Sequence, residues 1–191
     1  DVALHQGRGI KFSVSLPLGG DYITNDIMQA LNVTRQHAEE IKSYYTRLDQ
    51  GLFGRNVILD CSSYHTNKHK VSYDFLYNII ESRVEEIVRL IYGYLQSPEL
   101  GISIIGVKRV YITGGCAAMP SMRRWLERVF NIPVIVHQPD QLSSEYRHVV
   151  NTTCYGLIKY FAGYRRGTQN AQPKNWGSVV KKVRDYLALK K

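Results

Sequence analysis

Two predicted strands are each followed by a pair of glycines. Gly114-Gly115 follow the apolar run at residues 108–113, and Gly19-Gly20 follow the alternating run at residues 10–17. Glycine has no Cβ, so a ligand can approach the backbone of such a turn closely, and a helix that starts just beyond offers free N–H groups. Ligands of parallel sheets bind at the carboxyl ends of the strands. The two turns together predict a cleft lined by backbone, whereas either turn alone is more typical of a structural element.

Glu39 and Lys42 place opposite charges three residues apart in a segment with helical periodicity. Residues at this spacing lie on one face of a helix. Such a pair can hold a ribose hydroxyl and the edge of a base, and a charged face turned to solvent is the common alternative.

The histidines and cysteines do not form a recognisable catalytic or metal-binding pattern. His65 and His69 are four apart, but they lie in a polar turn. The three cysteines, Cys61, Cys116 and Cys154, are far apart and lack CxxC spacing. The sequence therefore predicts neither a disulfide framework nor a zinc site.

The periodicity of the apolar residues predicts an α/β chain. A strand at residues 108–113, a helix that opens at Pro120 and a strand at residues 132–136 form a parallel α/β unit. The longest helix begins after Ser72 and carries an apolar stripe. The other predicted elements are a helix capped by Asp21 or Thr24, a helix capped by Thr34, a small hairpin within residues 51–71 and a last helix from Tyr146 to Tyr164.

The C-terminal residues combine a linker with a basic amphipathic segment. The chain has 25 Lys and Arg against 16 Asp and Glu, a net charge of +9, and residues 174–191 hold six of the basic residues against one aspartate. Residues 165–175 have almost nothing to bury and predict a linker. Residues 176–191 predict a helix whose apolar stripe suits an anionic membrane surface, with packing on its own domain as the alternative. The predicted membrane contacts are Trp176, Val179, Val180, Lys181, Lys182, Val183, Arg184, Tyr186 and Leu187.

Taken in order, these motifs resemble the FtsA family of actin-like ATPases. Residues 10–45 contain P-x-G-G, then T-x-D-I, then A-E-x-I-K, as that family does. Residues 108–135 are similar to the adenosine-binding segment that the family shares with the actin and heat-shock chaperone superfamily, and residues 176–191 resemble its membrane-targeting helix. The resemblance covers nearly the whole chain and implies the C-terminal half of such a protein, with Asp1 as the last residue of a phosphate-binding loop.

The fold that this resemblance implies is an actin-like, ribonuclease H-like α/β lobe. The lobe would comprise residues 1–31 and 106–164, with a small α+β subdomain inserted at residues 32–105. A linker at residues 165–175 and an amphipathic membrane-targeting helix at residues 176–191 would follow.

The resemblance also implies ATP and Mg²⁺ as cofactors, with most ligands of the phosphates and the metal outside this chain and slow hydrolysis at most. The implied partners are the C-terminal peptide of FtsZ, further copies of the protein in filaments and an anionic membrane. The protein would tether FtsZ at the cytoplasmic face of the cell membrane, at the division site. The implied cofactor-binding residues are Gly19, Gly20, Glu39, Lys42, Gly114, Gly115, Cys116 and Met119.

Two other functions remain open at this point. The first is an ATPase of the same fold that serves pilus assembly, as PilM does, although such chains are not expected to end in a basic amphipathic tail. The second is a basic nucleic-acid binder, which is not expected because the basic residues are not interleaved with aromatic residues in an RNA-binding pattern.

Overall fold

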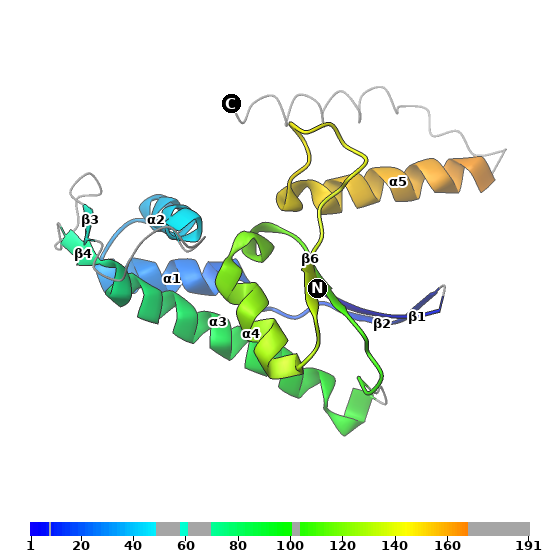
Figure 1. The fold of residues 1–191 in the computed structure, drawn as a ribbon, viewed down its shortest axis with the longest axis horizontal. Coiled ribbons are helices and arrows are strands. Elements are labelled where there is room, and N and C mark those ends of the chain that lie inside the picture. The colour runs from blue at the N-terminus through cyan, green and yellow to red at the C-terminus, as the bar shows by residue number, and fades with distance from the viewer. Residues whose placement is uncertain (8, 49–57, 61–69, 101–103, 168–191) are drawn as a thin grey trace. The chain divides into compact units, whose positions relative to one another are not determined.

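A computed structural model describes residues 1–7, 9–48, 58–60, 70–100 and 104–167. The chain divides into two compact units, residues 1–153 and residues 154–191. The first unit contains the helices and strands from β1 (Val2–Gln6) to β6 (Val134–Val136) (Figure 1). In the second unit, the described residues belong to the helix α5 (Thr152–Gly167). The predicted membrane helix at residues 176–191, from Trp176 to Leu187 and beyond, lies outside the described residues, and no helix within them is long and apolar enough to cross a membrane.

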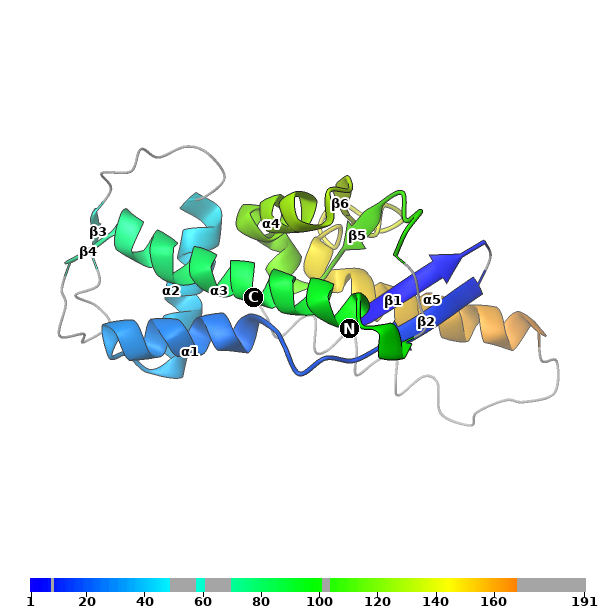
Figure 2. The ribbon, with the colours of Figure 1, turned by 90° about the horizontal axis from the view of Figure 1, so that it is seen from below.

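Helices supply most of the buried core residues of the first unit. Helix α1 (Gly20–Leu31) packs against both α2 (Arg35–Leu48) and α3 (Tyr73–Leu95), and α3 also packs against α4 (Pro120–Phe130). Figure 2 shows α3 running alongside α1 and α4. The apolar stripes of these helices meet in one core, because residues three and four apart share a helix face. Its fully buried members include Ile23, Ile27, Leu31, Tyr45, Leu76, Ile80, Val84 and Val88.

The strands of the first unit pair in twos among the described residues. β1 (Val2–Gln6) pairs antiparallel with β2 (Gly9–Val14), and β3 (Ile58–Asp60) pairs antiparallel with β4 (Lys70–Ser72). β5 (Val110–Ile112) pairs in parallel with β6 (Val134–Val136), and α4 connects the two. This confirms the predicted parallel α/β unit and the two strands of the predicted small hairpin.

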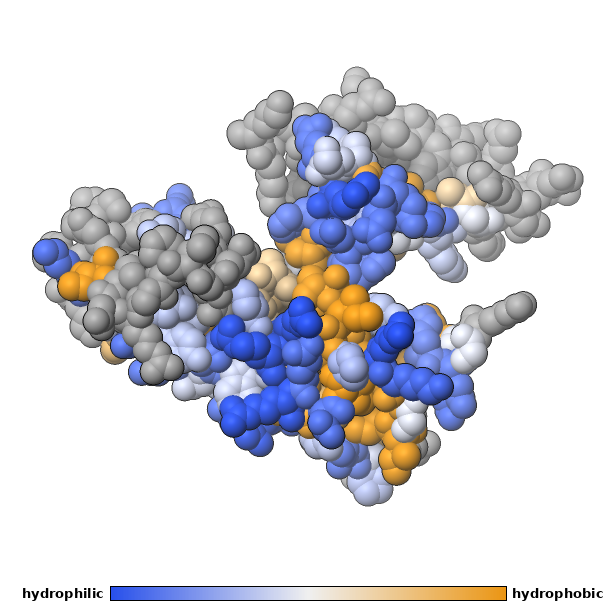
Figure 3. Space-filling model, in the orientation of Figure 1, coloured by the Kyte–Doolittle hydropathy of each residue, from blue (hydrophilic) through white to orange (hydrophobic). Residues whose placement is uncertain are grey.

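Apolar side chains are exposed beside the parallel strand pair. Figure 3 shows them gathered next to the charged outer face of α4. Ile135 and Val136 on β6 and Ile105 in the segment before β5 are exposed. A parallel sheet is normally covered on both faces, so exposed apolar side chains are unusual beside such a strand pair.

Three of the predicted helix starts are confirmed. The Oγ of Ser72 accepts a hydrogen bond from the N–H of Phe75 at 3.2 Å and caps α3. The Oγ1 of Thr34 accepts from the N–H of His37 at 3.4 Å at the start of α2. Pro120 is the first residue of α4, where its missing N–H would have no partner in any case.

Other predicted boundaries are wrong. The N-cap of α1 is Gly19 and not Asp21 or Thr24, since the backbone is still extended at Gly19 and Thr24 lies buried inside the helix. Strand β2 ends at Val14, before Pro17, whose nitrogen has no hydrogen to donate to a ladder.

The C-terminal helix of the described chain is also shifted. A short 3₁₀ turn, η4 (Val149–Asn151), precedes α5, so that the helix begins at Thr152 and not at Tyr146. Nδ1 of His148 accepts a hydrogen bond from the N–H of Val150 at 3.4 Å and caps that turn. Helix α5 continues to Gly167, into residues predicted as linker, because no proline interrupts it earlier.

One core spans the predicted subdomain boundaries. Ile23 of α1, Ile80 of α3 and Leu126 of α4 all belong to it, although residues 32–105 were predicted to form an inserted subdomain. The limits of the inserted subdomain at residues 31/32 and 105/106 remain predictions.

Two polar contacts tie α3 to its neighbours. Arg83 binds Asp26 of α1 with both ends of its guanidinium, Nε to Oδ2 at 2.5 Å and Nη2 to Oδ1 at 2.8 Å. Glu81, which is 8% exposed, accepts hydrogen bonds from Nη2 of Arg124 at 3.1 Å and from Nε1 of Trp125 at 2.8 Å. Because buried polar groups are stable only when they are paired, these contacts fix which faces of the helices meet.

Candidate functional site

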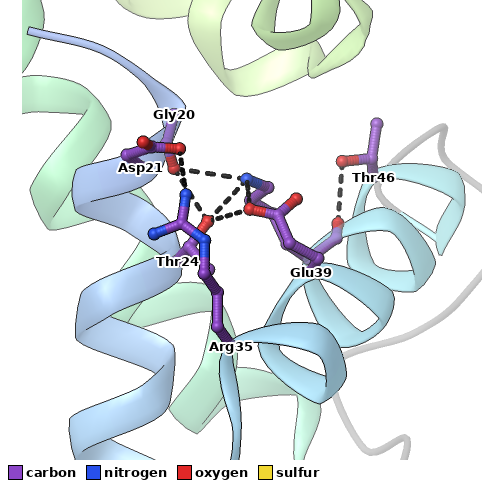
Figure 4. A network of polar contacts seen from close by, with 7 residues as sticks. Gly20, Asp21, Thr24, Arg35, Glu39 and Thr46 are labelled. Carbon is purple, nitrogen blue, oxygen red and sulfur yellow. Dashed lines mark hydrogen bonds and ion pairs between the residues drawn. The ribbon is translucent and has the colours of Figure 1, made fainter.

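The first turn of α1 meets the middle of α2 in a network of polar contacts. The ammonium group of Lys42 donates to the carbonyl oxygen of Gly20 at 3.2 Å, to Oγ1 of Thr24 at 2.7 Å and to Oε1 of Glu39 at 2.7 Å (Figure 4). Lys42 and Glu39 share one face of α2, as their spacing predicts. The network therefore uses three of the predicted site residues, Gly20, Glu39 and Lys42, to hold α2 against the start of α1.

Lys42 and Glu39 differ in how much of each remains accessible. The side chain of Lys42 is 14% exposed and that of Glu39 is 44% exposed. A lysine ammonium has three N–H donors, and the three contacts of Lys42 use all of them. Oε1 of Glu39 also lies within hydrogen-bond distance of Oγ1 of Thr24, while Oε2 has no hydrogen-bond partner among the described residues. Glu39 is thus the member of the pair with hydrogen-bonding capacity to spare.

The environment of Glu39 favours its ionised form. Partial burial acts against the charge, but hydrogen bonds from Lys42 and Thr24 outweigh it, so the pKa of Glu39 lies below its ordinary value of 4.5. The nearby positive charge of Arg35 acts in the same direction. Glu39 is therefore a carboxylate at neutral pH, and its unpaired oxygen is a hydrogen-bond acceptor.

The loop after β5 is built from glycines that leave its backbone open. Gly114 has a φ of +93°, a backbone conformation that residues other than glycine rarely adopt. Its N–H donates to the carbonyl oxygen of Val149 at 3.2 Å, and Oγ1 of Thr113 donates to the same oxygen at 3.1 Å. Gly115 then opens the 3₁₀ turn η3 (Gly115–Ala118). Among the described residues no heavy atom lies within 4 Å of the position of a Cβ on Gly19, Gly114 or Gly115.

Cys116 brings this loop against the first turn of α1. A Cβ on Gly20 would lie 2.7 Å from Sγ of Cys116 and 3.6 Å from Nζ of Lys42, so the close approach depends on the absence of a side chain at Gly20. Burial raises the pKa of the Cys116 thiol, more than Lys42 lowers it. Cys116 is therefore a neutral packing group at neutral pH and not an activated nucleophile.

Most of the predicted site residues come together at this place. Gly20, Glu39, Lys42 and Cys116 form one contact group, although they come from three separate elements. Gly114 and Gly115 belong to the same loop as Cys116, and Gly19 directly precedes α1. Met119 differs, since it is 3% exposed and belongs to the hydrophobic core.

Sequence reasoning missed Thr24 as a member of the site. Thr24 lies in the T-x-D-I segment and was interpreted from the sequence only as a possible N-cap of the first helix. The available signal was its position between Ile23 and Ile27, on the apolar side of α1, where a hydroxyl must find a polar partner.

The family model described as "Cell division protein FtsA" matches residues 1–156. The chain belongs to the FtsA family. The FtsA of Pseudomonas aeruginosa is 27% identical over 164 residues, which cover 84% of this chain and 39% of that protein. The FtsA of Bacillus subtilis is 30% identical over 160 residues, covering 83% of this chain and 35% of that protein, and the FtsA of Streptococcus pneumoniae is 24% identical over 196 residues, covering 97% and 42%. The chain thus spans about two-fifths of the length of these FtsA relatives.

Proposed function

We propose that this chain is part of a cell division protein that binds ATP and tethers FtsZ to the cytoplasmic membrane. The observation that carries the ATP site is the convergence of Gly20, Glu39, Lys42 and Cys116 at one junction of the FtsA-type fold. The relatives are cell division proteins, which supports the cellular role. A pilus-assembly ATPase is not favoured, because the family model and the reported relatives are of the FtsA type.

The residues present fit the adenosine part of a nucleotide. The backbone at Gly114 and Gly115 is open, so the flat face of a base or ribose can approach it closely. Glu39 offers an ionised oxygen to ribose hydroxyl groups, which are hydrogen-bond donors. In this arrangement the glycine loop forms one wall and the exposed end of Glu39 the other. ATP would supply the phosphoryl chemistry, whereas these residues bind and orient the nucleoside.

Among the described residues, no cluster of side chains corresponds to a magnesium site. Within the described ranges, no three His, Cys, Asp or Glu side chains gather in a way that would hold a metal ion. Mg²⁺ and the phosphates belong, in this proposal, to parts of the protein other than the residues discussed above.

Titration with adenosine tests the proposed nucleoside site. A valine at Gly115 projects into the open space in front of the loop, so Gly115→Val is expected to weaken adenosine binding by roughly tenfold or more, measured by NMR chemical shifts. Gly93→Val on α3 is the matched control, because it too meets no heavy atom within 4 Å of its Cβ and lies away from the junction. Equal affinities of the two variants would contradict the site.

The membrane and FtsZ roles rest on the sequence of the C-terminal segment and on the family. Co-sedimentation with vesicles of anionic lipid compares the 191-residue chain with a chain that ends at Arg166. Only the longer chain is expected to pellet, and added salt is expected to release it, since each basic residue near an anionic surface contributes about 1 kcal/mol. If both chains behave alike, the tail does not anchor the protein. Binding of the FtsZ C-terminal peptide to the 191-residue chain is the corresponding test of the partner.

A further inference from the structure

Thr24 is the buried centre of the junction between α1 and α2. Its side chain is fully buried, its Oγ1 accepts from Nζ of Lys42 at 2.7 Å, and it lies within hydrogen-bond distance of Oε1 of Glu39 and, at 3.0 Å, of the carbonyl oxygen of Gly20. A hydroxyl has one proton and two lone pairs. Thr24 therefore accepts from the ammonium group and donates its own O–H hydrogen bond to one of the two oxygens that face it, Oε1 of Glu39 or the carbonyl oxygen of Gly20.

These contacts fix one half of the Glu39 carboxylate and leave the other half free. Lys42 and Thr24 both approach Oε1, so rotation of the carboxylate would break the hydrogen bond from Lys42 and the contact with Thr24 (Figure 4). Oε2 has no partner among the described residues, and the side chain is 44% exposed. Lys42 has already committed its three N–H groups, so it has none left for a ligand unless one of these contacts breaks.

We propose that Thr24 is a positioning residue that aims Oε2 of Glu39 at a ribose hydroxyl of the bound nucleotide. The inference rests on the proposed adenosine site and divides the roles within it. Glu39 contacts the ligand, while Thr24 and Lys42 orient Glu39 from the buried side. The site would accordingly distinguish ribose from a sugar that lacks the hydroxyl, because the free carboxylate oxygen would then lose its donor.

The test compares adenosine with 2′-deoxyadenosine and 3′-deoxyadenosine on the 191-residue chain. The wild-type chain is expected to bind adenosine roughly tenfold more tightly than one of the two analogues, as expected for one hydrogen bond to a charged group. Thr24→Val removes the hydroxyl and keeps the shape of the side chain. It is expected to weaken adenosine binding toward the level of that analogue and to leave the affinity for the analogue unchanged. Thr24→Ser should restore the preference.

A purely structural role of Thr24 would give a different pattern. The affinities for all three nucleosides would then fall together, and serine would not selectively restore the preference for the hydroxyl. If the wild type binds adenosine and Thr24→Val keeps the full preference, the positioning role is overturned while the proposed function stands.

A second readout does not depend on any nucleotide. The pKa of the Glu39 carboxyl group can be followed by carbon NMR, and Thr24→Val is expected to raise it because one hydrogen bond to the ionised form is lost. Thr24→Ser should leave it near the wild-type position. An unchanged Glu39 titration in Thr24→Val overturns the positioning role even if adenosine does not bind, in which case the proposed adenosine site fails on its own.

Discussion

Glu39 and Glu81 are two carboxylates at helix junctions with opposite surroundings. Both oxygens of Glu81 are engaged, one by Arg124 and one by Trp125, and the residue is 8% exposed. Glu39 has one oxygen engaged, and its side chain is 44% exposed. A carboxylate whose acceptors are filled by its own chain holds helices together, whereas one with an unfilled oxygen keeps capacity for a ligand. Residue type alone does not separate these two roles, but the count of engaged oxygens does.

The largest expected effect is on the α3–α4 junction. Glu81→Ala leaves the indole N–H of Trp125 and the guanidinium of Arg124 without this partner, and we expect a loss of about 3 kcal/mol in the free energy of unfolding. Urea denaturation measures it. Glu85→Ala on the same helix removes only an exposed pair with Arg89 and should cost less than about 1 kcal/mol. Equal losses for the two variants would show that Glu81 is not the structural member of the comparison.

The next largest effect on stability is expected at the contact between α1 and the loop after β5. Gly20→Ala places a methyl group against Sγ of Cys116, and we expect it to lower the free energy of unfolding by about 1–2 kcal/mol. Cys116→Ala removes the obstructing sulfur, so the double variant should be more stable than the sum of the two single changes predicts. Thermal unfolding of the four proteins completes the cycle. Strict additivity would mean that Gly20 and Cys116 do not touch.

Glu39 itself should matter little for stability. Glu39→Gln retains the size of the side chain and alters a group that is nearly half exposed, so we expect a change below about 1 kcal/mol in urea denaturation. A loss as large as that of Glu81→Ala would break the comparison, because Glu39 would then be a structural carboxylate as well.

The smallest effect is a dependence on pH. The pKa of Glu39 is lower in the folded chain than its ordinary value of 4.5, so the unfolded chain takes up a proton first as the solution is acidified. The stabilisation from Glu39 is therefore present above about pH 4.5 and is lost as the pH falls through the folded pKa. The wild type should lose slightly more stability than Glu39→Gln over this interval. Parallel acid profiles would contradict the lowered pKa.

Several features that depend on neighbours in sequence were predicted correctly. Ser72, Thr34 and Pro120 mark helix starts through contacts that lie within one turn, and the residues around them suffice to predict these starts. The Glu39–Lys42 pair is likewise a matter of helical spacing. The family motifs added the expectation that the glycine loop and this pair belong to one site.

The individual side-chain contacts between elements were not predicted. The role of Thr24 arises because α2 crosses α1 and brings Glu39 and Lys42 to it. The contact of Cys116 with Gly20 joins segments that are far apart in sequence. Periodicity indicates that a helix has a buried face, but it does not indicate which polar atoms of another helix will meet it there.

Lys42 has a consequence for chemical modification of the protein. Reagents that acylate amines attack through the nitrogen lone pair, which Lys42 can present only after it loses a proton and gives up contacts with Gly20, Thr24 and Glu39. Lysines that lie free in solvent would be acylated sooner. The rate at which Lys42 is labelled would thus report how often its contacts with Gly20, Thr24 and Glu39 break, and an acetyl group attached there would remove the charge and two of the three donors of the network.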